Sequence, residues 1–409
     1  MLILQHSENT AVGKSALTLN TTGANNVAVG TASLDANTTG ARNTALGNAA
    51  LSANTTASYN TACGDNSLVA NTTGASNTAC GQQSLDANTT GGENTAVGTN
   101  ALGANTTANY NSAFGANALI INTTGHSNTA LGYNSMYYTT TGDYNVAVGR
   151  NSLQVNTTGD ANVAVGRTAL NSSTTASNNT AVGDQALYAL TTGIRNVAIG
   201  VSAGDSITTS EKNVAVGAYA LNSNTTGDGM NVCIGYDAGD SITTGNRNVC
   251  VGTNANPNSA TGTKQYVFGH DLTGKGDNTL FAGGASGTYN EANGSHWDQI
   301  SDRRIKKNIV DNTTGLSIIN QIQVRNFEYK TEDEIKTDNP ELTDVVKSAV
   351  VNKTGTQLGL IAQEVEAVLE SAVLTTSVGV KSLQTDDLFW HMLNAIKELS
   401  IKVTALEAG

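Results

Sequence analysis

From Asn9 to Phe268 the chain repeats one arrangement of polar and apolar positions every 17 residues. Each repeat opens with a five-residue phrase of the NTAVG type, in which Asn comes first, apolar and small residues alternate, and Gly comes last. Leu usually follows four residues after that Gly, and an Asn-Thr-Thr-Gly segment usually ends the repeat. The phrase begins at Asn9, Asn26, Asn43, Asn60, Asn77, Asn94, Asn111, Asn128, Asn145, Asn162, Asn179, Asn196, Asn213, Asn231, Asn248 and Gln265. Self-similarity at a fixed period of this length is typical of a solenoid.

The repeat predicts short strands and disfavours helix. Gly and Asn at fixed places break helices, while brief V/A/I/T phrases between turn residues predict strands of four to five residues. Within NTAVG, Thr and Val lie on one face of the strand and Ala on the other, so like residues stack as coils pile up. Sixteen coils at ~4.8 Å predict a mainly β rod on the order of 75 Å long. One step has 18 residues, because 227–230 holds an extra one.

The repeat decays over residues 257–300, and bulky side chains gather near its end. Exposed aromatic residues at the tip of a rod are good anchors for a ligand, glycans especially. They are equally suited to form the apolar plug that caps the end of a solenoid, and both interpretations stay open. The candidate residues are Tyr266, Phe268, His270, Phe281, Tyr289, His296 and Trp297.

Residues 301–409 have the pattern of an ordinary small α+β domain. Apolar spacing predicts a short helix at 316–322 and a helical face at 361–369, and alternation predicts a strand at 324–329. The polar stretch 331–356 is expected to be a loop or an excursion from the domain. The last helix carries a heptad seam, and its residue preference alone leans toward a dimeric coiled coil. The seam consists of Phe389, Met392, Ile396, Leu399, Val403 and Leu406.

Composition and charge exclude several classes of function. A formal net charge of −12 with no basic stripe argues against nucleic acid as a partner. No run approaches 18 apolar residues, and the start MLILQHSENT lacks the features of a signal peptide, so neither a membrane span nor secretion by this route is expected. We therefore expect a protein that is soluble in the cytoplasm where it is made.

The four cysteines form two pairs with the spacing of the repeat. Cys63 and Cys80 replace the usual Val or Leu of the phrase, and Cys233 and Cys250 replace the usual Ala. All four are expected to be small buried hydrophobic residues. A disulfide or metal site is disfavoured because neither a CxxC motif nor nearby histidines are present. No motif in the sequence predicts a bound cofactor.

The junction between the two parts carries the candidate chemistry. Ser301 lies five residues before Lys306, with Arg303, Arg304 and Lys307 close by. Like charge and desolvation lower the pKa of a lysine, whose neutral amine can then activate a hydroxyl. Alternatively, Ser301 is a helix N-cap and the basic run a solvated first turn. A spacing of five separates the side chains on a regular helix, so a dyad needs an irregular turn or two subunits.

The segments SDRRIKKNI (301–309), FEY (327–329), GLIAQEV (359–365) and AIKEL (395–399) resemble the endosialidase-type intramolecular chaperone. The resemblance implies a trimeric chaperone that templates folding of a fibre and then cuts itself off. It implies Ser301 as nucleophile, Lys306 as base and Ile300–Ser301 as the scissile bond. A tyrosine expected after Val380-Lys381 is missing, because Ser382 and Leu383 follow.

The repeats themselves resemble those of trimeric adhesins and phage fibres. This resemblance implies three parallel chains with Ala and Gly where backbones crowd the axis, and it outweighs the dimer preference of the helical seam. Whether each chain coils alone or the three interwind stays open. A uniform repeat pairs equally well at many registers, so an external clamp is needed.

We therefore expect a homotrimeric viral tail fibre made in the host cytoplasm, with a stalk (1–256), a distal tip (257–300) and a self-cleaving chaperone (301–409). Its expected partners are a host-surface glycan or protein receptor and a tail or adaptor protein at the N-terminus. A bacterial surface adhesin with the same chaperone is the alternative. A glycan depolymerase is disfavoured because stalk carboxylates are scattered, and an ice-binding solenoid because the Thr-Thr pairs lie in turns.

Overall fold

The computed structural model describes residues 8–283, 288–291, 309–338, 355–375 and 381–408. The chain divides into two compact units, Met1–Ile300 and Ser301–Gly409. Each unit has an apolar core of its own. The mainly β solenoid, the small sheets and the C-terminal helix predicted from the pattern are all present.

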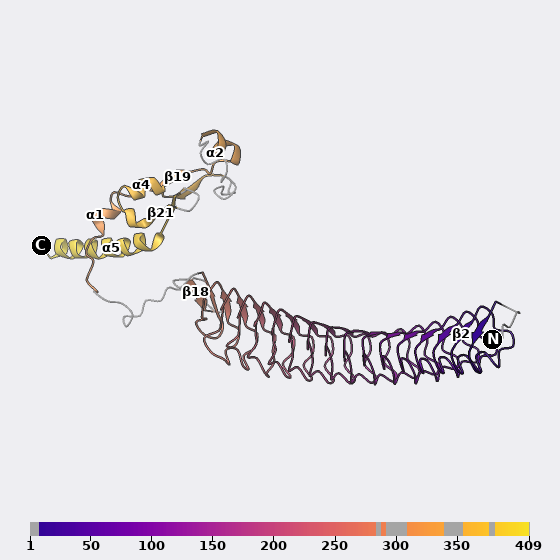
Figure 1. Ribbon diagram of the computed structural model, residues 1–409. Coiled ribbons are helices and arrows are strands. Elements are labelled where there is room, and N and C mark those ends of the chain that lie inside the picture. The colour runs from indigo at the N-terminus through magenta and orange to yellow at the C-terminus, as the bar shows by residue number, and fades with distance from the viewer. Residues whose placement is uncertain (1–7, 284–287, 292–308, 339–354, 376–380, 409) are drawn as a thin grey trace. The chain divides into compact units, whose positions relative to one another are not determined.

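The first unit is a β-solenoid in which a single chain forms every coil (Figure 1). Each coil contributes a three-residue strand that pairs in parallel with the strand of the next coil, so the strands are shorter than the four to five residues expected. The strands are β1 (Thr10–Val12), β2 (Val27–Val29), β3 (Thr44–Leu46), β4 (Thr61–Cys63), β5 (Thr78–Cys80), β6 (Thr95–Val97), β7 (Ser112–Phe114), β8 (Thr129–Leu131), β9 (Val146–Val148), β10 (Val163–Val165), β11 (Thr180–Val182), β12 (Val197–Ile199), β13 (Val214–Val216), β14 (Val232–Ile234), β15 (Val249–Val251) and β16 (Tyr266–Phe268).

The two faces of these strands differ as predicted. The central residue of each strand, which is Ala in β1 to β13, points into its own coil and is buried, and the residues before and after it point outward. Leu residues such as Leu119 fill the rest of the coil interior and are fully buried. Because the Ala column is enclosed by its own chain, Ala does not line an axis between chains, and this part of the expectation is wrong.

The Gly that ends each phrase is required by both conformation and space. Gly149 has a φ of 130°, and a Cβ there would lie 2.5 Å from the carbonyl oxygen of Gly166 in the next coil. A side chain would therefore meet backbone atoms that cannot move aside. This contact explains why Gly recurs at this place in every coil.

Buried asparagines form a continuous ladder along the stalk. The Oδ1 atom of Asn145 accepts from the backbone N–H of Asn162 at 3.0 Å, and its Nδ2 donates to the Gly159 carbonyl at 2.9 Å. The same bonds recur in coil after coil. They satisfy backbone groups that would otherwise be buried without partners.

The step of 18 residues leaves the ladder intact. Val214 of β13 still pairs with Val232 of β14, so the extra residue is taken up in the turn before β14. Gly227 and Gly229 in that turn have φ values of 106° and 67°. A Cβ on Gly229 would collide with the carbonyl of Glu211, so the turn depends on glycine there.

The last coil is closed by a change of strand direction. β17 (Thr279–Ala282) continues the parallel ladder, and β18 (Thr288–Glu291) pairs with it antiparallel. Phe281 is buried at this end, and the Lys275 ammonium lies 4.5 Å from the centre of its ring. A cation at this distance from an aromatic face is attractive.

The second unit packs short elements against a long helix, α5 (Thr385–Glu407). Val365, Ala372 and Leu388 are the buried centre of its core. Within the stretch 331–356, predicted to be a loop or an excursion, α2 occupies the start, and residues 339–354 lie outside the described residues. The other elements are α1 (Leu316–Ile319), β19 (Arg325–Phe327), α2 (Glu332–Asp338), β20 (Gln357–Gly359), α4 (Ala362–Glu366), a 3-10 helix (Glu370–Ala372), β21 (Val373–Thr375) and β22 (Lys381–Leu383).

Candidate functional site

The predicted dyad lies outside the described residues. Ile300, Ser301 and Lys306 all fall within 292–308, and the chain is described again from Ile309. The dyad therefore stays a prediction. What the structure does describe is how the segment that follows it is anchored.

Helix α5 holds the backbone of this segment by hydrogen bonds from its side chains. Nδ2 of Asn394 donates to the carbonyl of Asn312 at 2.9 Å. Nδ1 of His391 lies 2.7 Å from the carbonyl of Thr314, a distance at which the protonated nitrogen donates. Both side chains reach residues about 80 positions earlier in the chain, a contact that spacing in the sequence does not reveal.

The anchor continues one turn further along the helix. The backbone N–H of Leu316 donates to Oε1 of Glu398 at 3.3 Å. Gly315 lies so close to the helix that a Cβ would meet the backbone nitrogen of Ala395. Residues 312–316 are therefore fixed on α5, and the basic segment that contains Ser301 and Lys306 leads directly into this anchored stretch.

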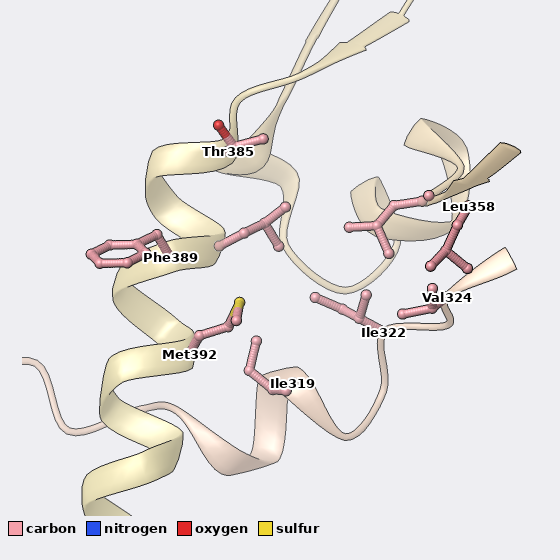
Figure 2. A pocket seen from close by; sticks show the side chains of 10 residues that line it. Ile319, Ile322, Val324, Leu358, Thr385, Phe389 and Met392 are labelled. Atoms are coloured by element: carbon pink, nitrogen blue, oxygen red, sulfur yellow. The ribbon is translucent and has the colours of Figure 1, made fainter. Parts of the chain in front are cut away.

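An apolar hollow of about 620 Å³ lies beside the anchor. Figure 2 shows Ile322, Val324 and Leu358 across the hollow from Met392 of α5, with Ile319 close to Met392. Val324 and Leu358 are 64% and 74% exposed. Apolar side chains this open to solvent are typical of a surface that another chain covers.

Helix α5 itself exposes more apolar surface than a helix of a monomeric domain usually does. All six residues of the predicted seam are exposed, from Phe389 to Leu406. Trp390, Leu393 and Ile401 form a second exposed row. The helix is confirmed, and its seam points to solvent in the single chain.

Two ion pairs connect the small elements of this unit. Arg325 of β19 donates twice to Glu364 of α4, with both distances 3.0 Å, and this bonding followed by the carboxylate charge raises the pKa of Arg325. Lys381 of β22 pairs with Glu366 of α4. The segment that lacks the expected tyrosine is therefore tied to α4 by charge.

The predicted tip residues separate into distinct environments. Tyr266 and Phe268 point outward on β16, and His270 is exposed with Nδ1 2.9 Å from Oδ2 of Asp271. Phe281 is buried in the cap, where it acts as a plug. Tyr289 lies on β18 opposite Phe281 in the strand register. The remaining two candidates, His296 and Trp297, lie outside the described residues.

The cysteines differ from the expectation for one pair. Cys233 and Cys250 are fully buried, and hydrogen bonding between the two thiols, followed by burial, raises the pKa of Cys233. Cys63 and Cys80 are only partly buried, because they lie on the outward face of β4 and β5. Their full burial was wrongly predicted, since the Val and Leu places that they occupy face out of the coil.

Other site types find no support in the part of the chain that the structure describes. No group of three or more His, Cys, Asp or Glu side chains there could hold a metal ion. None of the described helices is long and apolar enough to cross a membrane. The Asn side chains of the repeated Asn-Thr-Thr triplets, such as Asn54 and Asn105, are buried and hydrogen-bonded, as expected for turns.

Comparison with known proteins gives a family match for the C-terminal part of the chain. Residues 301–374 match the family model described as the chaperone of endosialidase. The match begins at Ser301, where the second compact unit begins. Curated proteins and solved structures give no match. The C-terminal part is thus similar to an endosialidase-type chaperone, and with the solenoid before it supports the resemblance to fibre and tailspike proteins of that type.

Proposed function

We propose that the protein is a homotrimeric viral tail fibre whose C-terminal unit templates assembly and then releases itself. One observation carries the proposal: the chaperone match starts at the first residue of the dyad motif, at the boundary between the solenoid and the second unit. A stalk of near-identical coils needs a clamp that sets its register. A removable trimerising domain at one end of the stalk provides such a clamp.

The proposed cleavage uses the chain's own residues. The neutral amine of Lys306 takes the proton of the Ser301 hydroxyl, and Oγ attacks the carbonyl carbon of Ile300. The bond from that carbon to the Ser301 nitrogen breaks, so the Ile300 acyl group becomes an ester of Oγ, and the nitrogen, which stays on Ser301, takes the proton from Lys306 and becomes a free amine. Water then hydrolyses the Ile300 ester, which gives a carboxylate on Ile300 and restores the Ser301 hydroxyl.

In the proposed trimer the exposed rows of α5 are covered by neighbouring copies. The rows supply the apolar heptad surface that helix association needs. The anchored segment 312–316 moves with α5, so association of the helices also fixes where the cleavage segment enters the unit. This arrangement couples assembly to cleavage.

The same proposal assigns a binding role to each end of the stalk. Tyr266, Phe268 and His270 remain exposed near the end of the stalk and are candidates for contact with a host-surface glycan or protein. The opposite end is proposed to join a tail or adaptor protein. A bacterial surface adhesin with the same chaperone is the second candidate, because its stalk would need the same clamp.

Intact mass measured on wild type, Ser301→Ala and Lys306→Ala tests the cleavage. We expect wild type to give pieces that end at Ile300 and start at Ser301, and both variants to stay at 41.9 kDa. Ser317→Ala and Lys402→Ala, at exposed positions outside the basic segment, are matched controls that should still cleave. A wild-type chain that remains whole under folding conditions would show that the second unit is at most a permanent cap.

A further inference from the structure

We propose that the outward face of the stalk sheet is the surface through which parallel copies of this chain pack side by side along the stalk. The number and direction of the copies rest on the proposed function. The surface itself is argued from the described residues. We call it the sheet face, defined as the first and third residues of strands β1 to β16.

The sheet face carries no charged side chain at any of its positions in β1 to β16. Thr and Val fill most first positions, and Val, Leu, Ile, Cys and Phe fill the third. Val12, Leu131 and Ile234 are 46%, 48% and 40% exposed in the single chain. Charged residues do occur on the stalk beside this face, for example Arg167 and Asp184, which pair with each other at 2.7 Å.

The size of the sheet face suits a stable interface. A strip sixteen strands long at ~4.8 Å and roughly 10 Å wide covers about 750 Å². A standard protein interface buries about 800 Å² on each partner. The third residues form an apolar row along the whole length of this strip, and a contiguous exposed apolar row of this length is typical of an interaction surface.

The spacing of the sheet face identifies its occupant as another copy of the chain. The outward residues form straight rows in strict register, as Val146 opposite Val163 and Val148 opposite Val165 show. Only a partner with the same axial spacing fills the gaps between such rows over the whole length. A second solenoid of the same period has that spacing, whereas the rows of Val and Leu would leave the hydroxyl groups of a glycan without polar partners.

Two native cysteines report on whether the sheet face is covered. Cys63 and Cys80 are directly opposite one another on β4 and β5, and both point outward and are partly exposed in the single chain. Cys233 and Cys250 occupy the inward column and are fully buried. Packing of copies should therefore protect the first pair, while the second pair is protected by its own coil in either case.

The experiment counts reactive thiols on the folded full chain with a maleimide reagent, read by intact mass. We expect no label on wild type and four labels in denaturant. Leu46→Lys or Val97→Lys, on the strands that flank the reporter pair, should expose Cys63 and Cys80 and give two labels. Thr39→Lys and Thr90→Lys place the same charge on exposed turns and should give none.

Each other outcome has a definite meaning. Rapid labelling of two thiols in folded wild type overturns the proposal, because the sheet face is then bare. Protection that survives Leu46→Lys and Val97→Lys combined also overturns it, since the coil alone then shields the thiols. A variant that unfolds gives four labels instead of two. In that case Leu46→Thr, which adds no charge, takes the place of the unfolded variant, and we expect it to increase labelling of Cys63 and Cys80 only slightly.

Failure of this inference is separable from failure of the proposed function. Cleavage is read from the masses of the two pieces, and labelling is read from the stalk. Repeating the labelling on Ser301→Ala removes any dependence on cleavage. A chain that is cleaved but has exposed thiols refutes only the packing of copies through the sheet face. A chain that is not cleaved but has protected thiols refutes only self-cleavage.

Discussion

At the scale of single residues, ladders of hydrogen-bonded Asn side chains stabilise the stalk, and where a ladder is interrupted a buried polar atom is left without a partner. A second buried Asn column runs through the turns, where Nδ2 of Asn54 donates to Oδ1 of Asn37 and that of Asn71 to Oδ1 of Asn54. Among the described residues, two members of this column have a buried Oδ1 with no partner, Asn122 and Asn224. In each case the next coil lacks Asn at this place and has Thr139 or Ile242 instead.

This pattern predicts that Thr139→Asn stabilises the protein. The new amide would donate to Oδ1 of Asn122, and the substitution would also remove the Thr139 hydroxyl, which is itself buried without a partner. We expect the free energy of unfolding in urea to rise by about 1–2 kcal/mol. Thr139→Val removes the hydroxyl without completing the ladder and should gain less. Equal gains from the two variants would show that the ladder bond contributes nothing.

At the scale of one coil, the loss of a large side chain at one interior position is compensated by a larger side chain at another. Where Leu is replaced by Gly204, the residue three places later is Ile207 instead of a polar residue, and Ile207 fills the space. A Cβ on Gly204 would lie 2.9 Å from Cδ1 of Ile207. Gly239 and Ile242 repeat the exchange in a later coil.

A double-mutant cycle tests this compensation. Gly204→Leu alone should overpack the coil, and Ile207→Asn alone should leave a void, so each is expected to cost about 1–4 kcal/mol. The double variant recreates the pair that Leu221 and Asn224 form in the following coil and should recover most of that loss. The measurement is urea unfolding of all four proteins. Additive losses in the double variant would contradict the compensation.

At the scale of the whole molecule, the stalk is a sum of interchangeable coils. Deleting residues 145–161 removes one coil and brings Asn162 into the place of Asn145, so β10 should pair with β8 in the same register. We expect the far-ultraviolet circular dichroism per residue to be kept, the melting temperature to shift by only a few degrees, and the rod to shorten by ~4.8 Å.

The control for this prediction is a deletion out of phase. Removing only residues 145–152 places turn residues where a strand should be and breaks both the Ala column and the Asn ladder. This variant should unfold at a much lower temperature or fail to fold. Similar melting temperatures for the two deletions would show that the coils are not interchangeable units.

The sequence predicts the coil well because each coil is a local unit seen sixteen times. The period, the placing of Ala on the opposite strand face from Thr and Val, and the turn role of Asn-Thr-Thr all follow from residues within 17 positions of each other. The anchor of residues 312–316 on α5 does not, since Asn312 and Asn394 are 82 positions apart. The partial exposure of Cys63 does not follow from the sequence either, because the pattern of the repeat does not tell an apolar place that faces out of the coil from one that faces in.

The turn that takes up the extra residue before β14 separates two ways in which such a stalk can vary. Adding or removing whole coils changes the length of the stalk, whereas the turn at 227–230 changes its surface and leaves the strand pairing of Val214 with Val232 untouched. Evolution can therefore adjust reach and surface independently. For an engineer, Asp228 marks the place where a foreign peptide could be displayed without loss of register.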